Sequence, residues 1–127
     1  MKEQSLMMPV INLKRIYDPP ARTDGYRVLV DRLWPRGVKK EAAMIDEWAK
    51  DLAPSNELRK WFNHEVEKWE PFRERYLNEL HKNPAVELFT KAHARTPVLM
   101  LLFGAKDEKH NQAVVLKHFL EHLFSKK

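Results

Sequence analysis

Arg27-Val-Leu-Val-Asp-Arg-Leu-Trp-Pro-Arg-Gly-Val38 is the stretch that decides the fold of this chain. Its apolar run, residues 28–30, is typical of a strand buried on both faces, as in a parallel or mixed sheet. Pro35 cannot donate to a sheet ladder, and Gly37 accepts backbone angles that other residues resist, so the strand passes into a loop. Sites in open α/β folds lie at the carboxyl ends of such strands. The stretch therefore predicts a strand with a functional loop directly after it.

The rest of the chain indicates alternating strands and helices. We expect strands at 10–17, 27–32 and 97–103 and, within 38–53, a helical turn followed by a short strand. One helix is expected to begin at Pro54-Ser55, and three more are expected at 70–82, 84–94 and 110–124. Long helical crossovers between apolar strands imply parallel pairing. The sequence thus predicts a single layered α/β domain over residues 1–127. It has a small, mostly parallel sheet of three to five strands, helices packed on the sheet, and a loose start at residues 1–9.

Length and composition fit one globular domain. The chain has 127 residues, of which 43% are hydrophobic and 32% charged, and it contains no cysteine. Cysteine-ligated metals, disulfides and a thiolate nucleophile are therefore excluded, and a reducing cytosol is the location that we expect. The longest apolar run, Val98 to Phe103, is far shorter than the ~20 residues of a membrane helix, so no membrane partner is expected.

The positive charge is unevenly distributed. Residues 11–40 contain eight lysines and arginines against three aspartates, which accounts for the whole net charge of +5. A basic patch of this kind attracts phosphates, nucleic acid or anionic metabolites. A solvated basic surface without a ligand is an equally open alternative.

The loop after the defining strand supplies the first candidate site, Asp31, Arg32, Trp34 and Arg36. Arginine binds carboxylate or phosphate oxygens with a planar fork, and the Trp34 indole is suited to stack on a base or sugar. Asp31 is the candidate catalytic residue, as a general base or as an acceptor for a hydroxyl or amine. The structural alternative is that Asp31 pairs with an arginine or caps a turn while Trp34 packs under the loop.

The second candidate site is the loop at residues 104–111. Its glycine and the following helix start would bring unpaired backbone amides together, and Lys106 and Asn111 could add side-chain donors for an anion. A plain connector in which Asp107 or Asn111 caps the helix is the alternative. If the strands that precede the two loops are neighbours, both loops open on the same edge of the sheet.

No metal or other cofactor is expected. His118-Phe119-Leu120-Glu121-His122 has the spacing of one class of zinc enzymes, but a third ligand is expected well downstream and the apolar residues of this helix occupy its core side. The other sequence expectations concern histidines at the surface or at helix ends (His64, His81, His93) and tryptophans in the core (Trp48, Trp61, Trp69).

The chain also resembles a known family. Ile16-Tyr17-Asp18-Pro19 and Asp24-Gly-Tyr-Arg-Val-Leu-Val-Asp-Arg-Leu-Trp-Pro-Arg-Gly37, with Ala53-Pro54-Ser55 and the stretch at 101–111, are similar to the YeaO-like branch of the DUF488 family. The resemblance implies a compact α/β fold, in a family named for having no assigned function. Other DUF488 branches carry cysteines where this chain has Gly104-Ala105-Lys106 and Asn111-Gln112, so cysteine chemistry is not carried over.

Three functional hypotheses follow from the sequence. The first is a cytosolic protein that binds a small anionic ligand, such as a nucleotide or phosphorylated metabolite, at the strand ends, either as an enzyme of unknown reaction or as a binding protein. The second is a nucleic-acid-binding or regulatory module that uses the basic region at 11–40. The third is an interaction subunit whose exposed aromatic residues are covered by a partner.

Overall fold

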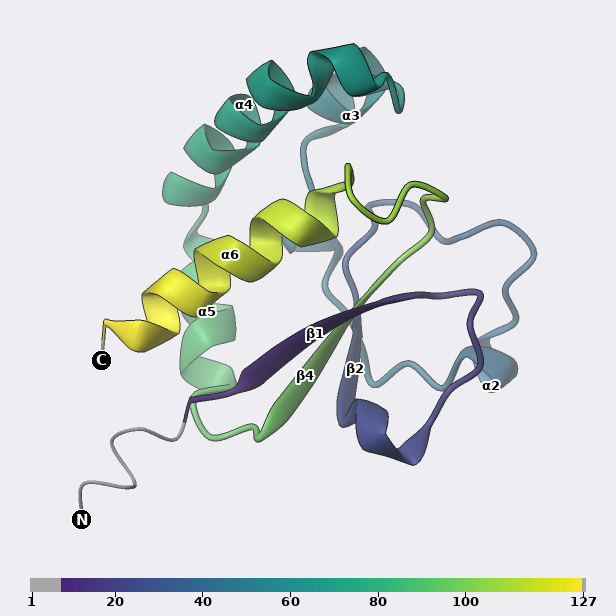
Figure 1. Ribbon diagram of the computed structural model, residues 1–127. Coiled ribbons are helices and arrows are strands. Elements are labelled where there is room, and N and C mark those ends of the chain that lie inside the picture. Colours follow the sequence, from purple (N-terminus) through teal and green to yellow (C-terminus); the bar gives the residue numbers. More distant parts are fainter. Residues whose placement is uncertain (1–7, 127) are drawn as a thin grey trace.

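The computed structural model describes residues 8–126 and shows an α/β fold with a four-stranded sheet of order β1-β4-β2-β3 (Figure 1). The strands are β1 (Val10–Arg15), β2 (Tyr26–Leu29), β3 (Glu47–Trp48) and β4 (Val98–Phe103), and every neighbouring pair is parallel. The helices are α2 (Lys40–Ala43), α3 (Asn56–Phe62), α4 (Trp69–His81), α5 (Pro84–Ala92) and α6 (Gln112–Ser125). Short 3-10 helices lie at η1 (Arg22–Asp24), η2 (Lys50–Leu52) and η3 (Val66–Lys68). The expected layered α/β class and parallel sheet are confirmed.

The two central strands, β2 and β4, are the apolar runs of the sequence. They pair in register from Tyr26 opposite Leu99 to Leu29 opposite Leu102. β4 is covered on both faces and is apolar throughout, whereas β2 has the buried, ion-paired Arg27 before its apolar residues Val28 and Leu29. This pairing places the loop after β2 beside the loop after β4, as the sequence predicts for neighbouring strands.

One face of the sheet carries the main hydrophobic core. Val28, Leu99 and Leu101 point into it and meet Tyr76 of α4 and Leu116 of α6, all of them fully buried. Helix α6 packs on β1 and β4, and α4 packs on α6, so this side of the sheet is helical (Figure 1). The amphipathic spacing seen in the sequence at 69–80 is the face that α4 buries here.

The opposite face is smaller and is covered mainly by the segment between β2 and β3. Leu29, Met100 and Leu102 form a second buried cluster with Ala43 of α2, and Trp34 packs against it. Figure 1 shows α2 on the side of the sheet away from α5 and α6. The loop after β2 therefore begins at the sheet edge and then folds back over the second face.

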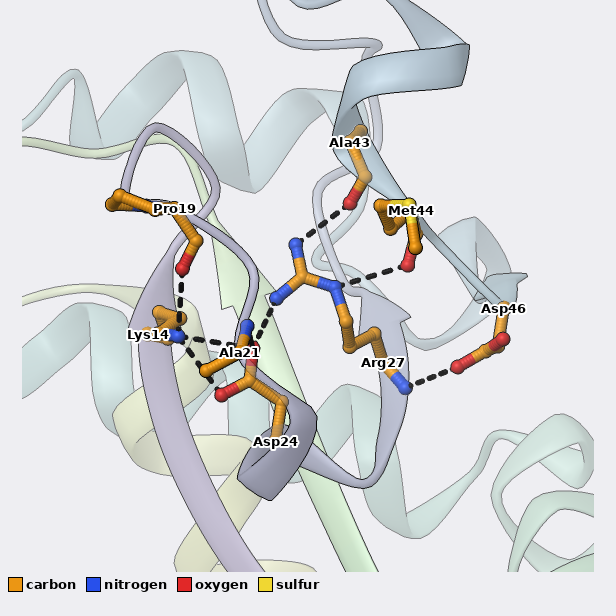
Figure 2. A network of polar contacts seen from close by, with 8 residues as sticks. All are labelled: Lys14, Pro19, Ala21, Asp24, Arg27, Ala43, Met44 and Asp46. Carbon is orange, nitrogen blue, oxygen red and sulfur yellow. Dashed lines mark hydrogen bonds and ion pairs between the residues drawn. The ribbon is translucent and has the colours of Figure 1, made fainter.

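A buried ionic network ties this second face together at the start of β2 (Figure 2). Asp24 is paired with Arg27 and with Lys14, whose Nζ lies 2.8 Å from Asp24 Oδ1. The Arg27 guanidinium also donates to the carbonyl oxygens of Ala43 at 2.7 Å and Met44 at 3.0 Å. The network therefore joins β1, η1, β2 and the end of α2.

Polar residues begin the helices as the sequence predicts. The Ser55 hydroxyl accepts the Leu58 amide at 3.2 Å, and Ser55 also donates from its hydroxyl to Glu79 of α4 at 2.6 Å. Asn83 accepts the amide of Ala85 at the start of α5. The bond from Ser55 to Glu79 fixes the start of α3 against α4, which positions α3 beside the strand ends.

One sequence expectation needs correction, one is met at a buried position, and one falls outside the described residues. Trp48 is 36% exposed rather than in the core, because β3 is an edge strand. His93 does end α5 but is buried rather than at the surface, with Nε2 3.0 Å from a Glu47 oxygen and Nδ1 2.9 Å from the Thr96 hydroxyl. The loose start expected at residues 1–9 lies, up to residue 7, outside the part of the chain that the structure describes.

Helices within residues 8–126 are all too short or too polar to cross a bilayer.

Candidate functional site

A cavity of about 400 Å³ opens at the carboxyl ends of β2 and β4. Its walls come from the loop after β2, the loop after β4, the first turn of α6 and the second half of α3. The two loops that the sequence proposes as candidate sites therefore meet here. The wall formed by α3 was not predicted.

Asp31 links the two loops. Its Oδ2 accepts the backbone amide of Gly104 at 2.9 Å, and its Oδ1 accepts the side-chain amide of Gln112 at 2.6 Å. A Cβ added at Gly104 would lie 2.9 Å from Asp31 Oδ2, so a side chain at that position would displace the carboxylate. Glycine is needed at 104 for this close approach.

The environment of Asp31 disfavours its charged form. Burial raises the pKa of this carboxyl above its ordinary value, although the hydrogen bonds from Gln112 and Gly104 and the charge of His64 act in the opposite direction. No arginine or lysine of the described residues forms an ion pair with it. The alternative in which Asp31 pairs with an arginine is therefore wrong. Asp31 is a buried acceptor that faces a cavity.

Arg32 lines the cavity, but part of its guanidinium is already engaged. Its Nε donates to the Pro54 carbonyl at 2.7 Å and its Nη2 to the Ala53 carbonyl at 3.2 Å. These bonds hold the turn before α3 against the loop after β2. Arg32 thus shapes the entrance of α3 and contributes positive charge to the wall.

Arg59 of α3 is the group that sequence reasoning missed. It lines the cavity, and its Nε is buried without a hydrogen-bond partner among the described residues. Its Nη2 donates to Asn56 in the same helix at a long 3.3 Å. A buried unpaired donor normally costs folding free energy, and no carboxylate of the described residues forms an ion pair with this guanidinium.

The chain leaves α3 through two residues in a strained conformation. Asn63 and His64 both have positive φ angles, of 48° and 58°, and both line the cavity. Asparagine and histidine both adopt this region more often than other non-glycine residues, and Asn63 is the C-cap of α3. Residues in this region concentrate at functional sites, and here both belong to the cavity wall.

Trp34 both lines the cavity and packs under the loop. Its indole Nε1 donates to the Val38 carbonyl at 2.7 Å, and its ring meets that of Trp48 edge-on at 5.3 Å. Trp48 in turn donates to the Asp31 carbonyl at 2.8 Å. The indole of Trp34 is therefore fixed in place, and one part of it forms the cavity wall.

The three remaining candidates, Arg36, Lys106 and Asn111, are not exposed ligand contacts in the cavity. Arg36 and Lys106 are exposed and do not line the cavity. Asn111 lines it but is 2% exposed, and its Oδ1 accepts the amides of Ala113 at 2.9 Å and Val114 at 3.2 Å. Capping of α6 by Asn111, the structural alternative, is confirmed.

Much of the basic charge at 11–40 has internal partners. Lys14 and Arg27 pair with Asp24, and Arg15 donates to the carbonyl oxygens of Ala105 and Gly104. Arg32 binds carbonyl oxygens as described above. This half of the basic region serves the fold, which the sequence alone did not indicate.

No three acidic or histidine side chains in residues 8–126 come together as a metal ion would require. His118 and His122 are exposed on α6, opposite its core side.

Comparisons with family models and with individual proteins place the chain in the same family. The profile of a family described as "Inactive DUF488-N3 subclade" matches residues 10–127. The uncharacterized protein YeaO of Escherichia coli (strain K12) is 47% identical over 113 residues, which cover 89% of this chain and 98% of that protein. The uncharacterized protein Rv3073c of Mycobacterium tuberculosis (strain ATCC 25618 / H37Rv) is 41% identical over 110 residues, which cover 87% of this chain and 92% of that protein. No solved structure matches the chain significantly.

Proposed function

The chain belongs to the DUF488 family, to the subclade described as inactive, and from this premise we propose that it binds a small anionic ligand in the strand-end cavity without converting it. The absence of cysteine and the description of the subclade both favour binding over catalysis. Asp31 then acts as a ligand contact and not as a general base.

The observation that carries this proposal is the Arg59 guanidinium at the cavity wall, whose Nε has no partner among the described residues and whose Nη2 has only a long 3.3 Å bond to Asn56. Buried guanidinium groups in proteins are usually paired with carboxylate or phosphate oxygens. In the described residues Arg59 Nε has no such partner, and the side chain lines a cavity. A phosphate or carboxylate group of a ligand would bind the terminal nitrogens of this guanidinium, of which Nη2 has only a long bond to Asn56, with Arg32 and Lys60 adding positive charge to the same wall.

The position and size of the cavity support the same conclusion. Ligand cavities in proteins measure roughly 300–1,000 Å³ and favour the carboxyl ends of parallel strands in open α/β folds. This cavity, at about 400 Å³, lies at such an edge between β2 and β4. A nucleotide or a phosphorylated metabolite is the ligand class that fits both its size and its charge.

The nucleic-acid alternative has less support. It depends on a continuous basic surface at 11–40, yet Lys14, Arg15 and Arg27 point to acceptors within the protein. The cations of that region without such a bond, for example Arg36, lie outside the cavity.

Calorimetric titration tests the proposal, with inorganic phosphate, ribose 5-phosphate and the common nucleoside 5′-monophosphates as probes. We expect at least one phosphorylated probe to bind, and Arg59→Met to weaken it by about 10- to 100-fold, as for the loss of a hydrogen bond to a charged group. Arg36→Met is the matched control, because Arg36 is an exposed arginine outside the cavity, and it should leave the affinity unchanged. Equal loss in both variants, or binding that neither changes, would place the ligand elsewhere.

A further inference from the structure

The cavity contains an acceptor as well as positive charge, and this restricts the ligand further, provided that the proposed function holds. Asp31 is acceptor-only when ionised, and in the described residues no cation pairs with it. A purely anionic ligand would bring a second negative charge beside this carboxylate and offer its free acceptor positions no donor. The ligand should therefore present a hydrogen-bond donor to Asp31 and an anionic group to Arg59.

Both oxygens of Asp31 remain able to accept a further bond. A carboxylate has about four acceptor positions, two on each oxygen. Gln112 uses one position on Oδ1 and Gly104 uses one on Oδ2. Each oxygen thus keeps one acceptor position, and the pair suits a ligand with two adjacent donors.

The walls indicate the shape of the donor group. Tyr17, Trp34, Phe62 and Phe72 are among the residues that line the cavity. Phe62 and Phe72 are buried and stack on each other with ring centroids 4.3 Å apart, so Tyr17 and Trp34 are the rings with exposed surface there. Base-sized planar rings stack favourably on such side chains, independently of hydrogen bonding. At about 400 Å³ the cavity would be largely empty around an amino acid or a bare phosphate, whereas a mononucleotide is of suitable size.

We infer that the cavity is selective for guanine mononucleotides, with the N1–H and N2 amino group of the base donating to the two Asp31 oxygens and the phosphate binding Arg59. Among the common bases, guanine alone presents two adjacent donors on its pairing edge. Adenine and cytosine present one donor beside an acceptor, and uracil presents one donor between two acceptors. Each of these would place an acceptor against the carboxylate, which is unfavourable.

The test compares monophosphates that differ only in the base edge. Guanosine, inosine, xanthosine and adenosine 5′-monophosphates share the ribose and phosphate, so differences among them report the contact with Asp31. We expect the guanosine compound to bind at least about tenfold more tightly than the other three, because one well-placed pair of bonds discriminates between bases by this factor or more. Equal affinities for all four would overturn the guanine inference and leave the anion-binding proposal intact. No binding of any of the four, with Arg59 intact, would count against both.

Asp31→Asn provides a second, independent measurement. The amide presents one donor and one acceptor. Gly104 still donates to its oxygen, and Gln112 can turn its amide over to accept from its nitrogen, giving up the long 3.4 Å bond to the Val30 carbonyl. The variant should lose at least about tenfold in affinity for guanosine monophosphate and gain for the xanthosine compound, whose edge has a donor beside an acceptor. Thermal unfolding checks that the variant is folded. Uniform loss for all bases in a folded variant would contradict a contact with the base.

Discussion

Strand β2 has an aspartate near each end, and the two behave in opposite ways. Asp24 lies just before the strand and is paired with Arg27 and Lys14, as Figure 2 shows. Asp31 lies just after it and accepts only neutral donors, from Gly104 and Gln112. Both carboxylates are held by short hydrogen bonds, but only Asp24 is held by cations.

The pKa values of the two groups differ in the corresponding directions. Burial of Asp24 opposes ionisation, but hydrogen bonds from Lys14, the Ala21 amide and Arg27 outweigh it and lower its pKa. Burial of Asp31 is not outweighed, and its pKa is raised. The opposite pKa shifts therefore distinguish two kinds of site. Asp24 belongs to a structural network whose charges are paired, whereas Asp31 and Arg59 line a site without an ion pair between them.

The largest expected effect on stability comes from Asp24, just before β2. Asp24→Ala leaves Arg27 buried without its carboxylate, so the free energy of unfolding should fall by about 3–5 kcal/mol. Urea denaturation followed by circular dichroism measures this loss. Asp18→Ala, at an exposed position, is the control and should change stability by no more than about 0.5 kcal/mol. A loss below about 1 kcal/mol for Asp24→Ala would mean that the network is not a structural anchor.

An intermediate effect is expected from Gly104→Ala. The new Cβ would lie 2.9 Å from Asp31 Oδ2, and such overpacking costs about 1–3 kcal/mol. The same denaturation experiment on Asp31→Ala and on the double variant gives the coupling energy. We expect the double variant to recover part of the Gly104→Ala loss. Simple additivity would show that the two residues do not touch.

The smallest effect, and the sharpest contrast, is in the pH dependence of stability. Asp24 has a lowered folded-state pKa, so its contribution is present above the unfolded-state pKa and is lost as the pH falls through the folded-state pKa. Asp31 has a raised folded-state pKa, so its ionised form reduces stability, and this penalty disappears as the pH falls through that pKa.

Unfolding free energies of the Asp→Asn variants, measured from pH 7 to pH 3, test these signs. Acidification should reduce the advantage of the wild type over Asp24→Asn and shift the comparison with Asp31→Asn in favour of the wild type. At neutral pH, Asp31→Asn should alter stability by no more than about 1 kcal/mol, because it leaves no buried cation unpaired. Parallel pH profiles for the two variants would remove the distinction between the ends of β2.

Local patterns in the sequence predicted most of the fold and one side of the site. Apolar runs predicted β2 and β4, and their pairing brings Asp31 next to Gly104. Capping chemistry at Ser55 and Asn111 predicted where two helices begin. These features depend on neighbours in sequence, or on the general geometry of parallel sheets, and so can be derived without the structure.

The missed features depend on contacts between distant segments. Arg59 has no local signal among the 23 lysines and arginines of the chain, and its role arises because α3 folds over the strand ends. The Ala43 and Met44 carbonyls that Arg27 binds are likewise distant in sequence, although its other partner, Asp24, lies only three residues before it. The proposed site leaves out Arg36 and Lys106, which the sequence offered as anion contacts, because both lie outside the cavity, and the Arg36→Met control tests this.

The most direct test of a ligand site at the carboxyl end of β2 is the Nε–H resonance of Arg59. A ¹H–¹⁵N spectrum detects this group, and Arg59→Met assigns it. We expect titration with guanosine 5′-monophosphate to shift the Arg59 Nε–H signal together with the Gly104 amide, which donates to Asp31, while the amide signals of Asp24 and Arg27 stay in place. Binding that leaves the Arg59 and Gly104 signals unmoved would contradict the site.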